Sequence, residues 1–188
     1  MSTATDFDAA VRAAGRGLAL FPLPAGGRVP APGWHAEATT DPAALVQMLA
    51  DGANIGVGCR ASRVVVLDLD VHQAEGPAIN GIETLRTQLD IRGLADWPET
   101  FTVMTPHQGL HLYFRVPASC TIGSFSGGRT RLGPGIDVRG PGRRRGGYLV
   151  GPGSIVGGLP YLITRDVPVA PLPDWISALL TPAEGMTP

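Results

Sequence analysis

The sequence contains no lysine, and all fifteen of its basic residues are arginines. Cysteine is also scarce: Cys59 and Cys120 lie far apart without the spacing of a zinc site, so no zinc is expected. Two such cysteines form no disulfide framework, which fits a reducing compartment. No apolar run reaches the roughly 18 residues of a membrane span, and the polar N-terminus is unlike a signal peptide. We therefore expect a cytoplasmic protein with no membrane partner.

The composition that is present predicts a globular protein, because 44% of the 188 residues are hydrophobic and only 16% are charged. The net charge of −1 argues against a protein that is basic as a whole. The arginines are nevertheless uneven, since six of them fall between residues 129 and 145, where Asp137 is the only acid. This stretch is either a local positive surface or simply a solvated loop, as charge runs usually are.

The hydrophobic pattern predicts an α+β fold. Helical spacing of apolar residues predicts helices at residues 7–14, 42–51, 80–91 and 174–180. Short apolar runs predict strands at residues 18–23, 54–58, 64–70, 101–104, 110–116, 136–138, 148–150 and 160–163. Closely spaced strands dominate after residue 100, which favours a largely antiparallel sheet. We expect one domain over residues 1–182, followed by a tail over residues 183–188.

The most informative segment is residues 63–70, where a run of Val and Leu leads into two carboxylates. Such a run is typical of a strand buried on both faces. Side chains alternate along a strand, so Asp68 and Asp70 should point to the same side. Two carboxylates there repel each other, and a divalent cation such as Mg²⁺ or Mn²⁺ removes the penalty. Alone, however, an Asp-x-Asp at a strand end also occurs by chance.

Two further residues extend this pair. His111 lies on the predicted strand at residues 110–116, which we expect to be half-buried with His111, Tyr113 and Arg115 on its polar face. Asp137 lies on a later short strand. Three carboxylates with a histidine and arginines suit metal-dependent phosphoryl transfer from a nucleoside triphosphate. Taken singly, His111 could be a structural histidine and Asp137 a turn residue.

Five segments, in order, resemble the bifunctional primase-polymerase (prim-pol) domain of the archaeo-eukaryotic primase superfamily. They comprise residues 28–41 (RVPAPGWHAEATTD), residues 54–71 with their NIG and VVLDLDV motifs, residues 98–114 with TP and GLHLYF, residues 135–154 with GIDVRG and GYLVGPGS, and residues 173–175 (PDW). Together they cover nearly the whole chain. The sequence departs from the family pattern at Arg28, where lysine is usual, and in the basic insertion at residues 141–145.

The resemblance implies a fold, an activity and a set of site residues. The implied fold is an RRM-like antiparallel catalytic sheet flanked by helices and joined to an N-terminal α/β part. The implied activity is template-directed nucleotidyl transfer from (d)NTPs in the replication of a plasmid, phage or other mobile element. Asp68, Asp70 and Asp137 would hold two Mg²⁺ or Mn²⁺ ions, and His111 would contact the triphosphate. The residues expected near the nucleotide are Arg139, Ser154, Asn54 and Gly56.

The expected partners are a (d)NTP, a single-stranded or primed DNA template, and a helicase acting in trans. The template would be bound through Arg129, Arg131, Arg143, Arg144 and Arg145. Two alternatives stay open at this point. One is a non-catalytic nucleotide- or DNA-binding module of the same fold. The other is a glycosyltransferase that uses Asp-x-Asp to hold manganese on a nucleotide sugar, although this explains neither His111 nor Asp137.

Overall fold

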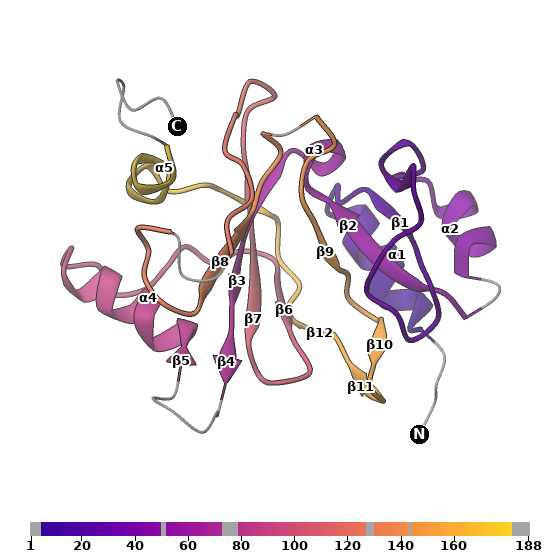
Figure 1. Ribbon diagram of the computed structural model, residues 1–188, viewed down its shortest axis with the longest axis horizontal. Coiled ribbons are helices and arrows are strands. Elements are labelled where there is room, and N and C mark those ends of the chain that lie inside the picture. Colours follow the sequence, from indigo (N-terminus) through magenta and orange to yellow (C-terminus); the bar gives the residue numbers. More distant parts are fainter. Residues whose placement is uncertain (1–4, 50–51, 73–78, 127–129, 143, 182–188) are drawn as a thin grey trace.

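The computed structural model describes residues 5–49, 52–72, 79–126, 130–142 and 144–181, and it has the α+β architecture that the sequence predicts. A six-stranded sheet crosses the middle of the molecule (Figure 1). Five of its strands follow one another in the spatial order β12 (Leu162–Arg165), β6 (Thr102–Met104), β7 (Leu110–Arg115), β3 (Val64–Leu69) and β8 (Ile136–Arg139). These neighbours are all antiparallel, while β13 (Ala170–Pro171) pairs with β7 in parallel.

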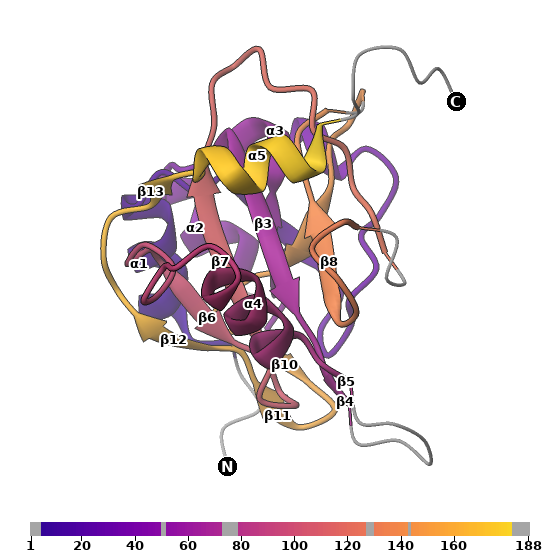
Figure 2. The same cartoon turned by 90° about the vertical axis from the view of Figure 1, so that its left-hand side faces the viewer.

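A smaller antiparallel sheet faces the central one and forms the N-terminal part of the fold. Its strands are β1 (Leu20–Leu23), β2 (Asn54–Gly58) and β9 (Tyr148–Val150). Helices α1 (Phe7–Gly15) and α2 (Pro42–Leu49) accompany this sheet on the right of Figure 1. Helices α4 (Gly81–Asp90) and α5 (Asp174–Leu180) cover the opposite face of the central sheet, as Figure 2 shows. The central sheet is therefore sandwiched between two layers.

Strand β3, which lies inside the central sheet, contributes side chains to both hydrophobic cores. Val64 and Val66 pack with the N-terminal part, whereas Val65, Leu67 and Leu69 pack beneath α4 and α5. This alternation explains the continuous apolar run, because both faces of the strand are covered. Asp68 occupies an alternate position with Val64 and Val66 and therefore lies on the same face of the strand. Its side chain points into the space between the two sheets.

The prediction of a half-buried strand at residues 110–116 is wrong. Leu112 and Phe114 lie in the core under α4 and α5, and Tyr113, on the other face, is fully buried in the N-terminal core. His111 is also buried, with 4% of its surface exposed. The reason is the second sheet, which covers the face that alternation alone assigns to solvent. Arg115 lies at the margin, where it donates hydrogen bonds to the carbonyls of Ser62 and Arg16.

The remaining elements are short, and the sequence pattern did not predict most of them. They are the 3₁₀ turn η1 (Trp34–Ala36), α3 (Cys59–Ser62), the paired strands β4 (Val71–His72) and β5 (Ile79–Asn80), and the hairpin of β10 (Ile155–Val156) and β11 (Leu159–Pro160). Such elements carry too few residues for a periodic signal. Cys59 and Cys120 are both free. None of the helices in the described part of the chain is long and apolar enough to cross a membrane.

Candidate active site

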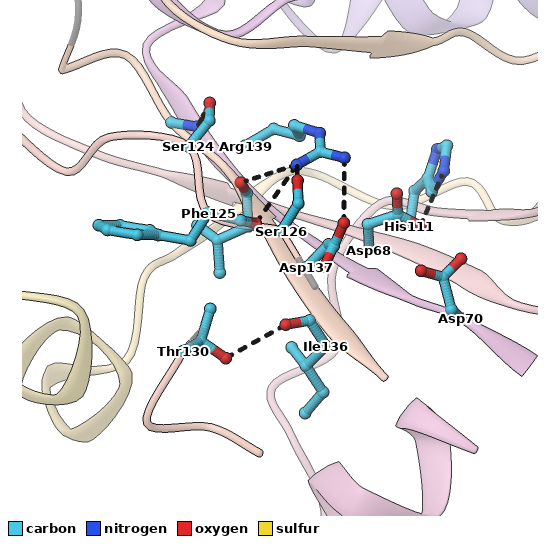
Figure 3. A network of polar contacts seen from close by, with 12 residues as sticks. Asp68, Asp70, His111, Ser124, Phe125, Ser126, Thr130, Ile136, Asp137 and Arg139 are labelled. Carbon is cyan, nitrogen blue, oxygen red and sulfur yellow. Dashed lines mark hydrogen bonds and ion pairs between the residues drawn. The ribbon is translucent and has the colours of Figure 1, made fainter. Parts of the chain in front are cut away.

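Three adjacent strands align polar side chains in one row across the central sheet. Asp68 on β3 is directly opposite His111 on β7 and, on its other side, directly opposite Asp137 on β8. Side chains in such cross-strand positions share a face of the sheet and stand about 5 Å apart at Cβ. The structure thus brings together residues that are up to 69 positions apart in the sequence (from 68 to 137), as Figure 3 shows.

Asp68 and His111 contact each other at the buried centre of this row. Nε2 of His111 lies 3.3 Å from Oδ1 of Asp68, and the two side chains are only 5% and 17% exposed. Burial alone opposes ionisation of Asp68. The attraction and hydrogen bond of His111, together with Arg139 and His72, outweigh burial and lower the pKa of this carboxyl below its usual value. Asp68 is therefore held as a carboxylate.

Asp137 is held by Arg139, which lies two residues further along β8. Nη2 of Arg139 donates to Oδ2 of Asp137 at 3.1 Å, and Nη1 donates to the hydroxyl of Ser126 at 2.6 Å and to the carbonyl of Phe125 at 3.3 Å (Figure 3). Both side chains are mostly buried, at 24% and 15% exposed. Arg139 is therefore fixed in one orientation at the edge of the row.

Asp70 lies one residue beyond β3, and its backbone is clamped. Its amide donates to the carbonyl of Gly135 at 2.8 Å, and its carbonyl accepts from the amide of Gly81 at 2.8 Å. Gly81 and Gly135 touch so closely that a Cβ at Gly81 would lie 2.1 Å from the Gly135 oxygen. This clamp fixes Asp70 beside Asp68, although its side chain remains 38% exposed.

The carboxyl of Asp70 lies close to two other carboxyls, those of Asp68 and Asp137. Burial raises its pKa, and the neighbouring charges of Asp68 and Asp137 raise it further, against an opposing effect of His72. His72 lies close by, with Nε2 at 3.9 Å from Oδ1 of Asp70. A positive charge placed beside Asp70 would therefore be more favourable than one beside an isolated carboxylate.

A cleft of about 610 Å³ opens above these residues, between the two sheets. Asp68, Asp70, His111 and Arg139 contribute to its walls. Sequence reasoning did not assign a role to several further lining residues, which include Arg28, His72, His107, Ser124, Tyr148 and Tyr161. For His72 a signal was available, because it continues the alternate positions 68 and 70. Tyr161 gave no signal, since only the folded hairpin brings its ring to 5.7 Å from that of His111.

The donor chemistry fits a hard divalent cation. Asp68, Asp70 and Asp137 offer carboxylate oxygens, which Mg²⁺ and Mn²⁺ prefer, and the raised pKa of Asp70 marks the charge that a cation would neutralise. In the described part of the chain, no three His, Cys, Asp or Glu side chains are already grouped closely enough to hold a metal ion. Two of the three carboxylates instead contact His111 and Arg139.

Two buried polar atoms in this region have no hydrogen-bond partner within the described structure: Nδ1 of His111 and the hydroxyl of Tyr113. Buried polar groups normally have partners, so an orphaned one points to a missing ligand or water. His111 lies at the wall of the cleft, and its Nδ1 is itself buried. Tyr113 lies deeper, and burial raises the pKa of its hydroxyl well above the usual value.

Of the residues predicted near the nucleotide, Asn54 and Ser154 form internal hydrogen bonds and Gly56 is closely packed, and none of the three lines the cleft. The side chain of Asn54 donates to the carbonyls of Gly27 and Ile155 and accepts from the Ile155 amide. The Ser154 hydroxyl, fully buried, accepts from the Ile55 amide at 2.9 Å and donates to its carbonyl at 3.1 Å. A Cβ at Gly56 would lie 2.2 Å from the ring of Phe21. Their predicted nucleotide contacts have no support from this geometry.

The predicted arginine surface is divided in the structure. Arg139 lines the cleft, whereas Arg144 and Arg145 line a separate cavity together with Arg60. Arg131 is exposed and belongs to neither. Arg129 and Arg143 lie outside the described residues. Trp34 packs against Phe21 and Tyr148, at ring-centroid distances of 4.4 and 5.2 Å, as expected for a packing residue.

Comparison with known proteins gives one family. The model described as bifunctional DNA primase/polymerase, N-terminal, matches residues 10–175. That match includes both sheets and every residue of the polar row. A search of curated proteins returned no match.

Proposed function

Because the chain belongs to the family of bifunctional DNA primase/polymerase N-terminal domains, and its function is therefore of the primase/polymerase type, we propose that it catalyses template-directed nucleotidyl transfer from (d)NTPs. The 3′-hydroxyl of a growing strand attacks the α-phosphate of the nucleotide. A phosphodiester bond forms, the bond to the β-phosphate breaks, pyrophosphate leaves, and the hydroxyl proton is released. We further propose that the reaction serves replication of a plasmid, phage or other mobile element.

The single observation that carries this proposal is the row of His111, Asp68 and Asp137 across three strands, with Asp70 beside it at the wall of one cleft. Asp68, Asp70 and Asp137 would hold the Mg²⁺ or Mn²⁺ ions. Such ions, when bound, neutralise charge on the attacking and leaving oxygens. Since Asp68 and Asp137 contact His111 and Arg139 in the structure, ion binding would require their carboxylates to turn away from these partners.

The protein's cationic and hydrogen-bonding groups complete the proposed site. His111 would use its unpartnered Nδ1 toward the triphosphate, and its Nε2 would keep Asp68 oriented. Arg139 and Arg28, at the cleft wall, supply positive charge for phosphate oxygens. Arg131, Arg144 and Arg145 would contact the template, and a helicase would act in trans. Arg129 and Arg143, predicted with them, lie outside the described residues.

A non-catalytic nucleotide- or DNA-binding module is the second candidate. One observation favours it: His111 and Arg139 already contact two of the three carboxylates. Such a module would bind a nucleoside triphosphate without joining it to a strand. The glycosyltransferase alternative has no support from the family match.

The test is nucleotide incorporation on a gel. The protein is incubated with single-stranded DNA, labelled dNTPs or NTPs and Mn²⁺ or Mg²⁺, with and without a primer. We expect labelled products from the wild type, and a loss on the order of 10²-fold or more in Asp68→Asn, which removes one charge without changing shape. Asp90→Asn, at an exposed position of α4, is the matched control and should retain activity.

The outcomes separate the two candidates. Binding of a nucleoside triphosphate that depends on metal, with no product at any nucleotide or metal, supports the binding module. Equal activity of Asp68→Asn and Asp90→Asn contradicts the assignment of the carboxylates. Products formed only with a primer identify an extending polymerase, and products formed without one identify a primase.

A further inference from the structure

A second cavity, of about 280 Å³, lies beside the catalytic cleft and is basic. Three arginines line it, Arg60, Arg144 and Arg145, together with His35 and Trp34. None of the described residues that line it is acidic. We call this cavity the arginine pocket. Sequence reasoning grouped Arg144 and Arg145 but had no means of adding Arg60, which is more than eighty positions away and comes to the cavity only through the fold.

The two sides of the arginine pocket are fixed to each other by backbone contacts. Arg60 lies on α3, and Arg144 and Arg145 lie in the segment that leads into β9. The Cys59 amide donates to the Gly147 carbonyl at 2.9 Å, which ties the start of α3 to this segment. Gly146, with φ of +71°, is packed so closely that a Cβ there would lie 2.7 Å from Cβ of Arg60. The backbone of Arg60 and that of residues 146–147, which directly follow Arg144 and Arg145, are therefore held together before any ligand binds.

The same segment forms the wall between the arginine pocket and the catalytic cleft. Gly146, Gly147 and Tyr148 line the cleft, while the two residues before them, Arg144 and Arg145, line the pocket. The arginine pocket and the cleft therefore adjoin along this segment, so a nucleic acid strand that leaves the cleft over Gly146 and Gly147 would next meet Arg144 and Arg145.

The chemistry of the arginine pocket suits phosphate groups. Arginine presents a planar fork that binds phosphate oxygens in pairs, and an arginine cluster whose described lining residues include no acid favours an anion. The ring of Trp34 is already packed against Phe21 and Tyr148, so it serves as a wall and not as a platform for a base. We propose that the arginine pocket binds internal phosphodiester groups of the template strand next to the active site. This proposal rests on the proposed function, which makes a DNA strand the substrate.

The test measures binding of single-stranded DNA by fluorescence anisotropy, on the full chain, without nucleotide or metal. The probe is an oligothymidylate of about 20 nucleotides, long enough to cover a site of single-strand binding proteins, titrated between roughly 50 and 200 mM salt. The variant is Arg144→Ala/Arg145→Ala. The matched control is Arg86→Ala/Arg165→Ala, which removes the same charge from a different cavity. Thermal melting checks that both variants fold.

The expected loss follows from counterion release. Each phosphate contact on a single strand contributes about 0.7 to the slope of log K against log salt. Losing two contacts should flatten the slope by about 1.4 and weaken binding about 25-fold at 0.1 M salt. Arg60→Ala should flatten it by about 0.7. The control variant should keep the wild-type slope.

Three outcomes overturn the proposal. One is an unchanged slope in Arg144→Ala/Arg145→Ala, and another is equal weakening in the control, which would reflect net charge alone. The third concerns a probe that carries a 5′-phosphate. If the wild type and the control bind this probe more tightly than the unphosphorylated one, and the pocket variant does not, the pocket belongs to a strand end. Failure of the proposed function looks different: no nucleotide is incorporated, while the pocket variants still weaken DNA binding.

Discussion

Replacing Asp70 by asparagine should make the metal-free protein more stable while weakening its response to metal. The folded state raises the pKa of this carboxyl, through burial and through the charges of Asp68 and Asp137. A raised acid pKa means that ionisation destabilises the fold. This destabilisation is fully present at neutral pH, and it disappears as the pH falls through the raised pKa toward 3.8, the value expected for the unfolded chain. Asparagine removes it at every pH.

The size of the effect follows from the spacing of the two carboxylates. Positions two apart on an extended chain are separated by about 7 Å, and unit charges at that distance repel by about 2 kcal/mol at an effective dielectric of 20 and about 0.6 kcal/mol in water. Because the Asp70 side chain is 38% exposed, solvent screens much of this repulsion. We expect a gain of about 1 kcal/mol, which is roughly 2–4 °C in Tm for a chain of this length.

Bound metal should reverse the difference in Tm, so that the wild type melts at a higher temperature than Asp70→Asn. An ion that binds only the folded state at 100 times its Kd stabilises by about 2.7 kcal/mol. That corresponds to a rise of roughly 5–10 °C in the Tm of the wild type. Asp70→Asn should show a much smaller rise, because one of the proposed ligands is lost.

The assay is thermal melting in EDTA and across a titration of Mg²⁺ or Mn²⁺, repeated from neutral pH down to about pH 4. Asp90→Asn, exposed on α4, serves as the control and should follow the wild type under all conditions. A metal-free Asp70→Asn protein that melts below the wild type would refute the charge argument. An undiminished metal response in that variant would refute Asp70 as a ligand.

Two further variants test residues on either side of the site. Ser154→Ala removes both hydrogen bonds to Ile55 in a fully buried position, so it should lower the free energy of unfolding by about 1–3 kcal/mol, measured in urea; a change in the KM for nucleotide at unchanged stability would contradict its structural role. His111→Ala leaves the buried carboxylate of Asp68 without its contact to Nε2 of His111, so the pKa of Asp68 should rise and stability at neutral pH should fall by about 1–3 kcal/mol. Chemical denaturation at pH 5 and pH 8 measures this, and equal stability of the two proteins would rule out the contact.

The sequence predicted the central strand and the identity of the polar row, but not the way the row is assembled. Val64 to Leu69 read as a buried strand because both of its faces are apolar, and the structure confirms this. The sequence of one strand does not determine its register with its neighbours. The direct opposition of Asp68 to both His111 and Asp137 is therefore seen only in the folded sheet. The periodic pattern of apolar residues within each strand does not specify how neighbouring strands are aligned.

The errors and omissions have a common physical cause, which is the second sheet. Alternation along residues 110–116 assigned His111 and Tyr113 to a polar face, and the N-terminal part covers that face. The same packing uses the polar atoms of Asn54 and Ser154 for bonds between β2 and the segment after β9. It also brings Arg60 to Arg144 and Arg145. Contacts between the layers depend on the fold of the whole chain, and the local pattern of apolar and polar residues does not predict them.

The clamp around Asp70 has a consequence for how this domain tolerates mutation. Gly81 and Gly135 are not among the residues that line the cleft and bear no functional group, yet their backbones touch each other and hold the residue that carries a proposed ligand. Even alanine at position 81 would force the two chain segments apart and move Asp70 with them. In a saturation screen for DNA synthesis, these two positions should therefore reject substitution as strictly as the carboxylates, although the loss would arise from displaced geometry and not from missing chemistry.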